Sequence, residues 1–418
     1  MNLYKLELKR VCKTRLTAIL LTLALVLAVF MAYMPVTFVR WVEQDAGGNR
    51  VVYTGVAAVH KRREHQVSGT ITTEVMQEAL AAYQKLFQKY NAKSISDIPT
   101  EEFYSELSRY QPFVNDAKEA FADPNTGVGP GVMGLTADDM THFYDQLPRR
   151  LEAVIQMENQ DKKGCEEAQA IAREKFDAVQ KPYTYYFGAG SEAIEYQTLL
   201  GLLLALLCAV IAAPIFSADA QSGAQDIQLC TKHGGLRLAV TKLAAALTVT
   251  GGAYLVCGVV WIVVTNTLFG WEGTRTSVQW AVSFSVTSLL PYTIGQMQWV
   301  MLLSNFALFL AAETFALAVS AWARSSLTAL SAALVSVVAP LIVYMVVPGS
   351  LGEWLSTLLP AGGIGLSNAL LYKMYSFDFL FAGGHAFFQA DVLRALAPVK
   401  IVLFLALAVW GYRRKMVR

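Results

Sequence analysis

The chain has 418 residues, of which 55% are hydrophobic and 16% are charged. Soluble domains carry about 25% charged residues on average, so this composition points to a membrane protein. The net charge of +2 gives no argument for a nucleic-acid partner, and none is expected. The five cysteines form no CxxC pair and no paired spacing, which predicts neither a zinc site nor a disulfide framework.

The amino end combines an apolar stripe with basic residues. In the segment 1–16, Tyr4, Leu8 and Val11 share one side of a helix, while the lysines and arginines lie largely elsewhere. This pattern predicts an amphipathic elbow helix in the inner membrane interface; the alternative is a plain basic anchor. The apolar run 17–39 follows. It is too long for a signal peptide and no A-x-A-like site follows it, so we expect an uncleaved transmembrane helix.

Six apolar runs are long enough to span a bilayer, which takes about 20 residues. The run near the carboxyl end is the weakest because Lys400 lies near one end, whereas the third is long enough to tilt or to extend beyond the membrane. The predicted spans are 17–39, 196–215, 238–268, 299–321, 326–347 and 396–412.

Basic residues orient these spans. The segments on one face hold 13 lysines and arginines, whereas the short loops on the other face, 269–298 and 348–400, hold four. Because basic loops stay inside, we expect a multi-pass protein of the cell membrane with both termini in the cytoplasm. The basic face comprises residues 1–16, 215–242, 322–326 and 411–418, so the tail 413–418 is cytoplasmic.

Residues 40–195 separate the first two spans and carry 17 basic and 24 acidic residues. This segment is too long and too charged for a loop, so it predicts an extracytoplasmic domain. The segments 50–60 and 64–74 alternate imperfectly and are expected to form a short β-hairpin. The pattern then becomes helical, and Thr136 followed by Asp139 predicts a helix start. The apolar positions at helical spacing are Met76, Leu80, Tyr83 and Phe87.

No motif in this domain indicates an enzyme. The stretch HKRREH, from His60 to His65, is not HExxH, and we interpret it as a solvated charged turn rather than a metal site. The Gly-rich segment 123–134 lacks a lysine at P-loop spacing and is expected to be a flexible loop. We therefore expect a binding or gating domain without a catalytic residue or a metal ligand. The fold class that results is an α-helical integral membrane protein with six spans and a mainly helical outer domain containing a small β-hairpin.

The polar hairpin 216–237 lies between two of the most apolar runs and is the largest cytoplasmic segment. No GxxxxGK[ST] motif occurs in the chain, so ATP-driven work would need a separate ATPase. Within and just after the hairpin, residues recur at the intervals of a motif, F-S-x-E-x-x-S-G followed by L-x-T-x-x-G-R and then a lysine. The matching residues are Phe216, Ser217, Asp219 in place of Glu, Ser222, Gly223, Leu229, Thr231, Gly234 and Lys242.

This hairpin resembles that of the ABC-2 type exporter permeases, and the resemblance extends to the six-span plan, the outer insertion and the turn SAWARSSLTALSAAL, but not to the outer domain. One departure is Gly235 in place of the usual Arg, with Arg237 two residues on. In such permeases the hairpin holds a coupling helix that docks on the ATPase. The elbow helix of these permeases also touches the ATPase. Asp219 and Asp226 near a helix start and Lys232 near its end would complement the helix dipole, and Gly234–Gly235 can end the helix.

The resemblance implies partners and a set of coupling residues. The partners are a cytoplasmic ABC ATPase, which carries ATP and Mg, a second permease subunit, identical or paralogous, and membrane lipid. No cofactor is expected on this chain, and ATP hydrolysis is expected only on the partner. The predicted coupling residues are Phe216, Asp219, Gly223, Asp226, Thr231, Lys232, Gly234, Arg237 and Lys242.

Two polar residues fall inside the fourth span. Glu313 lies near its middle, where a carboxylate is costly and marks a function or a specific partner. It could face a dimer seam, a substrate path or buried threonines such as Thr248 and Thr250. Asn305 lies eight residues earlier on a related face. Residues 348–395 are apolar with Pro and Gly breaks, and the resemblance implies re-entrant or interfacial helices there.

Two functions remain open at this point. The first is the permease subunit of an ABC exporter that moves an amphiphile (a peptide, an antibiotic or a lipid-like molecule) outward. The alternative is a non-transporting membrane sensor or scaffold that transmits binding at the outer domain. A secondary transporter is less favoured, because such proteins show repeated halves with broken helices at matching positions, and this sequence shows no such repeat.

Overall fold

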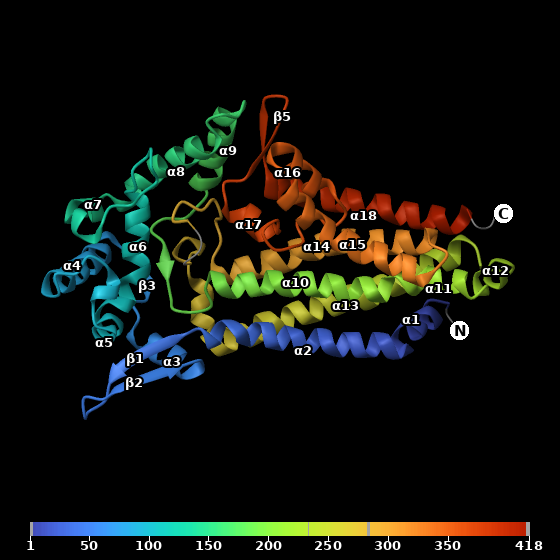
Figure 1. The fold of residues 1–418 in the computed structure, drawn as a ribbon, viewed down its shortest axis with the longest axis horizontal. Coiled ribbons are helices and arrows are strands. Elements are labelled where there is room, and N and C mark those ends of the chain that lie inside the picture. The colour runs from blue at the N-terminus through green and yellow to red at the C-terminus, as the bar shows by residue number, and fades with distance from the viewer. Residues whose placement is uncertain (1–2, 233, 282–284, 415–418) are drawn as a thin grey trace.

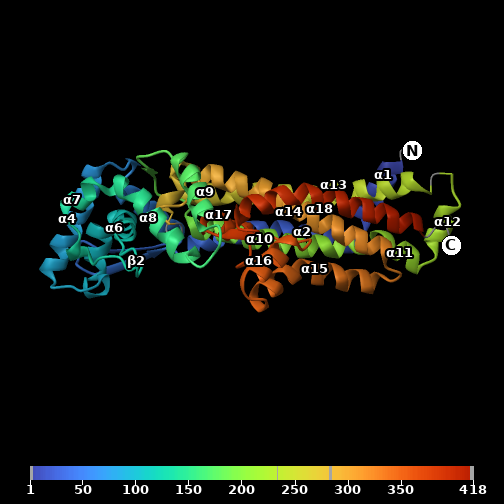
Figure 2. The same cartoon turned by 90° about the horizontal axis from the view of Figure 1, so that it is seen from above.

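Among the described residues, six helices are long and apolar enough to cross a membrane, and they lie side by side in one bundle (Figures 1 and 2). The computed structural model describes residues 3–232, 234–281 and 285–414. Residues 1–2 of the predicted elbow helix, His233 of the hairpin and residues 415–418 of the predicted tail lie outside this part. The predicted six-span helical fold is confirmed, and the chain is a multi-pass membrane protein.

Most spans extend beyond the apolar runs that predicted them, because a helix keeps its backbone hydrogen bonds into polar flanks. A short amphipathic helix, α1 (Leu3–Lys13), precedes the first span and is separated from it by Thr14. The spans are α2 (Arg15–Thr37), α10 (Ser191–Ala212) with its continuation α11 (Pro214–Gln221), α13 (Leu236–Phe269), α14 (Ile294–Trp322), α15 (Ser326–Val346) and α18 (Gln389–Arg414).

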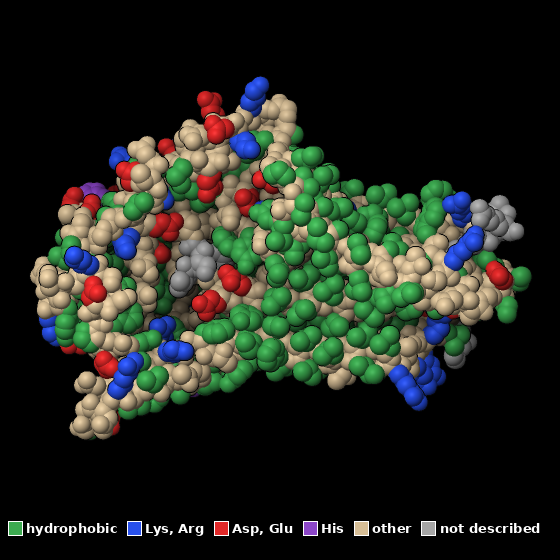
Figure 3. All heavy atoms as spheres, in the orientation of Figure 1, with side chains coloured by type: hydrophobic (Ala, Val, Ile, Leu, Met, Phe, Trp, Pro, Cys, Tyr) green, Lys and Arg blue, Asp and Glu red, His purple; other side chains and the backbone are tan. Residues whose placement is uncertain are grey.

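Helix α14 lies at the centre of the bundle and packs against α10, α13, α15 and α18. Small residues let these helices approach closely, as is typical of helix packing in lipid. At Gly258 of α13, an added Cβ would lie 2.3 Å from Cδ1 of Leu302 on α14. The face of the bundle seen in Figure 3 is mainly hydrophobic along its length, whereas charged side chains gather towards its two ends. This band is the expected lipid-facing surface.

The outer domain is mainly helical, as predicted. Met76, Leu80, Tyr83 and Phe87 are all buried, which confirms the core face assigned to them. Its elements are β1 (Arg40–Gln44), β2 (Arg50–Thr54), α3 (Val56–His65), β3 (Gly69–Thr70), α4 (Thr73–Lys89), η1 (Ile95–Asp97), α5 (Thr100–Glu102), η2 (Phe103–Leu107), η3 (Ser108–Tyr110), α6 (Gln111–Ala120), η4 (Val132–Gly134), α7 (Ala137–Thr141), α8 (Phe143–Asn159), α9 (Cys165–Asp177) and β4 (Thr184–Tyr185).

The β-hairpin exists, but the predicted pairing was wrong. Strand β1 pairs antiparallel with β2, so the segment 50–60 supplies only its first half to a strand. Gly55, with φ of 65°, turns the chain directly into α3, a conformation that glycine adopts at low cost. Strand β3, inside the segment 64–74, pairs instead with β4, more than 100 residues away. The stretch HKRREH therefore lies in a helix rather than in a turn.

The helix start predicted at Thr136 is confirmed. The Asp139 backbone N–H donates to Thr136 Oγ1 at 3.2 Å, and the Asp139 carboxylate accepts from the Thr136 backbone N–H at 2.8 Å. This reciprocal pair is a capping box, which satisfies two backbone donors that the first helical turn leaves free. Segment 123–134 is turns and irregular backbone that ends in η4, consistent with the predicted loop.

The loop between α13 and α14 belongs to the core of the outer domain. It contains η5 (Trp271–Arg275) and η6 (Val278–Trp280). The Trp280 ring stacks on Phe143 with centroids 5.9 Å apart and meets the edge of Phe113 at 5.1 Å. The Tyr183 hydroxyl donates to the backbone oxygen of Val286 at 3.0 Å. The outer domain is thus built from two separate stretches of chain.

Residues 348–395 form helices α16 (Gly349–Leu358) and α17 (Leu370–Tyr375) and an unpredicted hairpin of β5 (Phe379–Ala382) and β6 (His385–Phe388). Lys400, which weakened the prediction of the last span, has a structural role. Its Nζ donates to the backbone oxygens of Thr357 and Leu359, each at 2.7 Å. These carbonyls lie at the carboxyl end of α16, where helices lack internal donors and attract cations.

Candidate functional site

The bundle has two unlike ends. The domain end carries the outer domain, and the hairpin end carries α1, α11, the short helix α12 (Ala224–Leu229) and the carboxyl end of α18 (Figure 1). Sequence reasoning placed the coupling residues in the hairpin 216–237 and at Lys242. These residues divide into a group that points inward and a group that faces outward.

Asp219 is the centre of the inward group. Its carboxylate accepts from Arg10 Nη1 at 2.8 and 3.1 Å and forms a short ion pair with Lys242. The Lys242 side chain is fully buried, and the Asp219 side chain is 14% exposed. Arg10 Nε also pairs with Glu7 at 2.9 Å. Two cations and two carboxylates therefore balance where α1, α11 and α13 meet.

Lys242 has further partners that help to offset the cost of its burial. Nζ donates to Gln228 Oε1 at 2.8 Å, and it lies 5.7 Å from the ring centroid of Phe216 and 5.9 Å from that of Tyr412. A buried ammonium group is tolerated only when it is paired and hydrogen-bonded, and aromatic faces add attraction. We call Arg10, Asp219, Gln228 and Lys242 the hairpin cluster.

The chain closes tightly around this cluster. The Tyr412 hydroxyl of α18 donates to the backbone oxygen of Gly234 at 2.8 Å. An added Cβ at Gly234 would lie 1.7 Å from the backbone oxygen of Gln228, so only glycine fits there. At the start of α11, Ser320 Oγ donates to the Ala213 carbonyl at 2.6 Å and accepts from the Phe216 N–H at 3.0 Å. Helix α14 thereby holds the junction between α10 and α11.

The outward group lies on and just after α12. Asp226, Thr231, Lys232 and Arg237 are exposed, and the Thr231 hydroxyl donates to the Gln228 carbonyl at 2.7 Å. Ile227, which the sequence did not single out, is 74% exposed between them. The outward group therefore presents one exposed apolar side chain between charged ones at the hairpin end.

Three details of the predicted coupling helix were wrong. Asp219 lies in the second half of α11, not near a helix start. Gly223, with φ of 75°, separates α11 from α12, so the hairpin holds two short helices and not one. Helix α12 ends at Leu229, so Lys232 lies beyond its end and Gly234 closes a turn rather than the helix. Asp226 is the acid in the first turn of α12, as the dipole argument requires.

Glu313 lies apart from the hairpin cluster, inside α14. It is 2% exposed and lies beside Thr250 of α13, one of the predicted neighbours, whose hydroxyl donates to the backbone oxygen of Ala246 at 3.0 Å. Its Oε1 has no partner among the described residues. Asn305 lies about 12 Å along the same helix by the helical rise and, with Gln197 and Tyr254, lines a small cavity between α10, α13 and α14. The two polar residues therefore face different neighbours.

Sequence reasoning missed Gln228, a member of the cluster, and the neighbouring residues Ser320 and Tyr412, which hold the chain around it. The signal that could have found such partners is Lys242 itself, a cation at the start of a long apolar run that needs an acid nearby. In the described part of the chain, no group of three His, Cys, Asp or Glu side chains could hold a metal ion. His65 stacks on Trp41 with ring centroids 4.7 Å apart.

The hairpin end therefore combines a buried, hydrogen-bonded cluster with an exposed tip at α12. Comparison with protein-family models, with curated proteins and with solved structures found no match for the chain in any of the three.

Proposed function

We propose that this chain is the membrane-spanning permease subunit of an ATP-binding cassette exporter that is powered by a separate ATPase. The observation that carries the proposal is the hairpin cluster, which joins the amino-terminal helix, the hairpin and the third span through Asp219. The likeness of the hairpin motif to that of ABC-2 permeases adds support.

A hairpin that transmits movement has to be fixed to the spans it moves. Charge-assisted hydrogen bonds are short and directional, and those from Arg10 and Lys242 attach α11 to α1 and α13. Ser320 attaches the same helix to α14. A push on α12 would therefore reach the spans α13 and α14 and the helix α1 without being absorbed by a loose loop.

The exposed tip supplies the proposed contact with the ATPase. Ile227 would enter an apolar groove of the partner, and Asp226 and Lys232 would form its charged rim, the arrangement expected of a protein interface. In this proposal ATP and Mg stay on the ATPase, a second permease subunit, identical or paralogous, completes the path, and an amphiphile leaves at the domain end.

The test is a pull-down of the tagged full chain in mild detergent from its own membranes, followed by an ATPase assay on the eluate. We expect a cytoplasmic ATPase to co-elute and Ile227→Asp to abolish both co-elution and activity. The matched control is Val128→Asp, which changes an equally exposed apolar residue on the outer domain and should leave both unchanged.

A result with no ATPase in the eluate, or with equal ATPase recovery from both variants, contradicts the proposal. In the first case the alternative, a non-transporting sensor or scaffold, becomes the better account. The contacts between the outer domain and the loops of the bundle, such as that of Glu167 with the Ala386 N–H at 3.0 Å, suit such a role.

A further inference from the structure

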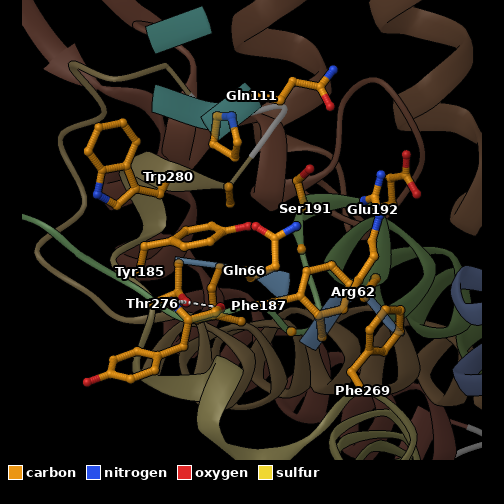
Figure 4. Close-up of a pocket in the computed structure, with 18 of the residues that line it drawn as sticks. Arg62, Gln66, Gln111, Tyr185, Phe187, Ser191, Glu192, Phe269, Thr276 and Trp280 are labelled. Atoms are coloured by element: carbon orange, nitrogen blue, oxygen red, sulfur yellow. Dashed lines mark hydrogen bonds between the residues drawn. The ribbon is translucent and has the colours of Figure 1, made fainter. Parts of the chain in front are cut away.

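A cavity lies where the outer domain meets the domain end of the bundle (Figure 4). Helices α3 and α6 of the outer domain form one side, and the ends of α2, α10, α13 and α14 form the other. Its volume is about 210 Å³, below the range of about 300 to 1,000 Å³ typical of sites for drug-sized ligands. The cavity therefore suits a small molecule. We call it the junction cavity.

Four side chains that line the junction cavity each have a buried polar atom without a hydrogen-bonding partner in the described part of the chain. Two are donors, Nε of Arg62 and Nε1 of Trp280, and two are oxygens, Oε1 of Gln66 and Oδ2 of Asp116. Among the described residues, no ion pair is formed by either Arg62 or Asp116.

Four buried polar atoms without hydrogen-bonding partners around one cavity lower the stability of a folded protein. Each buried polar atom that lacks a partner costs about 1–3 kcal/mol, and most such atoms in proteins are satisfied. Figure 4 shows Arg62 and Gln66 at one space together with Tyr185 and Phe187, whereas the Trp280 ring turns away from it towards the aromatic core. A molecule in that space could satisfy donors and acceptors together.

The walls define the chemistry of that molecule. Arg62 offers a guanidinium, which recognises carboxylates in a bidentate manner, and Glu192 at the mouth joins Asp116 in offering carboxyl groups. The remaining lining is aromatic and aliphatic, including Phe187, Phe269 and Ile294. Both signs of charge thus border a small apolar space.

We propose that the junction cavity binds a small zwitterionic amphiphile, a molecule with an ammonium group, a carboxylate and an apolar body, such as an apolar amino acid. Its carboxylate pairs with Arg62, its ammonium group pairs with Asp116 and Glu192, and its apolar body packs on Phe187 and Phe269. This site does not depend on the proposed coupling to an ATPase, because it lies at the opposite end of the bundle.

The test uses the purified full chain in mild detergent and three probes that share the same benzyl side chain. L-Phenylalanine carries both charges, L-phenylalanine amide only the cation, and N-acetyl-L-phenylalanine only the anion. Binding is measured by isothermal titration calorimetry. We expect phenylalanine to bind at least about tenfold more tightly than either single-charge probe, a difference of about 1.4 kcal/mol.

Variants assign each charge to its partner. Arg62→Gln should weaken phenylalanine and its N-acetyl form but not the amide, and Asp116→Asn should weaken phenylalanine and its amide but not the N-acetyl form. The matched controls are Arg63→Gln, next to Arg62 on α3, and Asp161→Asn, an exposed acid of the outer domain; both should bind as the unaltered chain does.

Equal binding of all three probes, no saturable binding of any probe, or variants that bind as their controls do would each overturn the proposal. The unfolding temperature and elution volume of every variant are measured first, and Arg62→Lys, which keeps the charge, provides a second variant should Arg62→Gln fail to fold. Loss of ATPase co-elution with binding intact rejects only the proposed exporter function.

Discussion

The two ends of the bundle differ in whether their charged side chains are paired. At the hairpin end, Asp219 and Lys242 satisfy each other, and Arg10 and Gln228 complete their hydrogen bonds. At the domain end, Arg62 and Asp116 border the same cavity, yet neither forms an ion pair within the described residues. A satisfied cluster holds elements together, whereas an unsatisfied one lowers stability and is kept for binding.

From this comparison, we expect the largest loss of stability when Asp219 is replaced. Asp219→Ala leaves the buried Lys242 ammonium without its counter-ion, and breaking a buried pair in this way costs about 3–5 kcal/mol. We expect a large fall in unfolding temperature and faster tryptic cleavage after Lys232 and Arg237. The control is Asp226→Ala, an exposed acid on α12. Equal stability of the two variants would show that the cluster is not structural.

A smaller loss is expected at the turn that covers the cluster. Gly234→Ala forces the Gln228 carbonyl to move, since the new Cβ would lie 1.7 Å from its oxygen, and overpacking of this kind costs about 1–3 kcal/mol. Gly252→Ala is the control, because its Cβ meets no atom within 4 Å in α13 and alanine favours a helix. Thermal unfolding should rank Gly234→Ala below the original chain and Gly252→Ala at or above it.

At the domain end, we expect removal of a buried polar group to raise the stability of the protein instead of lowering it. Asp116→Leu removes a buried oxygen that lacks a partner and is expected to stabilise the ligand-free protein by about 1 kcal/mol. Asp139→Leu is the contrast, since it removes a capping box and should destabilise by about 1 kcal/mol. If Asp116→Leu lowers the unfolding temperature as much as Asp139→Leu does, Asp116 has a stabilising partner. That result would contradict the difference drawn between the two ends.

The smallest effect is a pH dependence. Burial, reinforced by Glu119, raises the pKa of Asp116 well above its usual range. The folded protein therefore holds this proton more tightly than the unfolded chain, whose Asp pKa is about 3.9. The stability contribution is complete below that value and is lost as the pH rises through the folded pKa. Tyr144, Tyr183 and Tyr185 face the same group.

Unfolding temperatures measured across this pH range check the effect. The unaltered ligand-free chain should lose stability with rising pH, and Asp116→Asn should flatten that slope. A slope that persists in Asp116→Asn would assign the titration to another group, such as Glu119.

Local sequence patterns predicted the spans correctly. They did not predict contacts between residues that lie far apart in the chain. The apolar runs were sufficient for all six spans because membrane insertion depends on length and hydropathy. The capping box at Thr136 is equally local. In contrast, β3 pairs with β4 across more than 100 residues, and Arg10 reaches Asp219 across 209. No periodicity within a short window encodes such pairs, so the β-hairpin was assigned to neighbouring segments and wrongly paired.

The candidate site was predictable only in its outline. The motif from Phe216 to Lys242 marked the hairpin, but one glycine, Gly223, decided that it holds two helices. The junction cavity left no sequence signal, because its lining comes from α3, α6, two loops and four spans. Arg62 and Asp116 are ordinary charged residues of helices until the fold places them around one space.

The place of Trp280 sets the order in which the molecule can be made. Its ring completes the core formed by Phe113, Phe143 and Tyr183, yet it follows them in the chain by nearly a hundred residues or more. During synthesis these three rings therefore leave the ribosome before Trp280 and remain without this partner until it has been made. This core can close only after α13 and the loop between α13 and α14 have been made, so a closed core requires that the third span has already been synthesised.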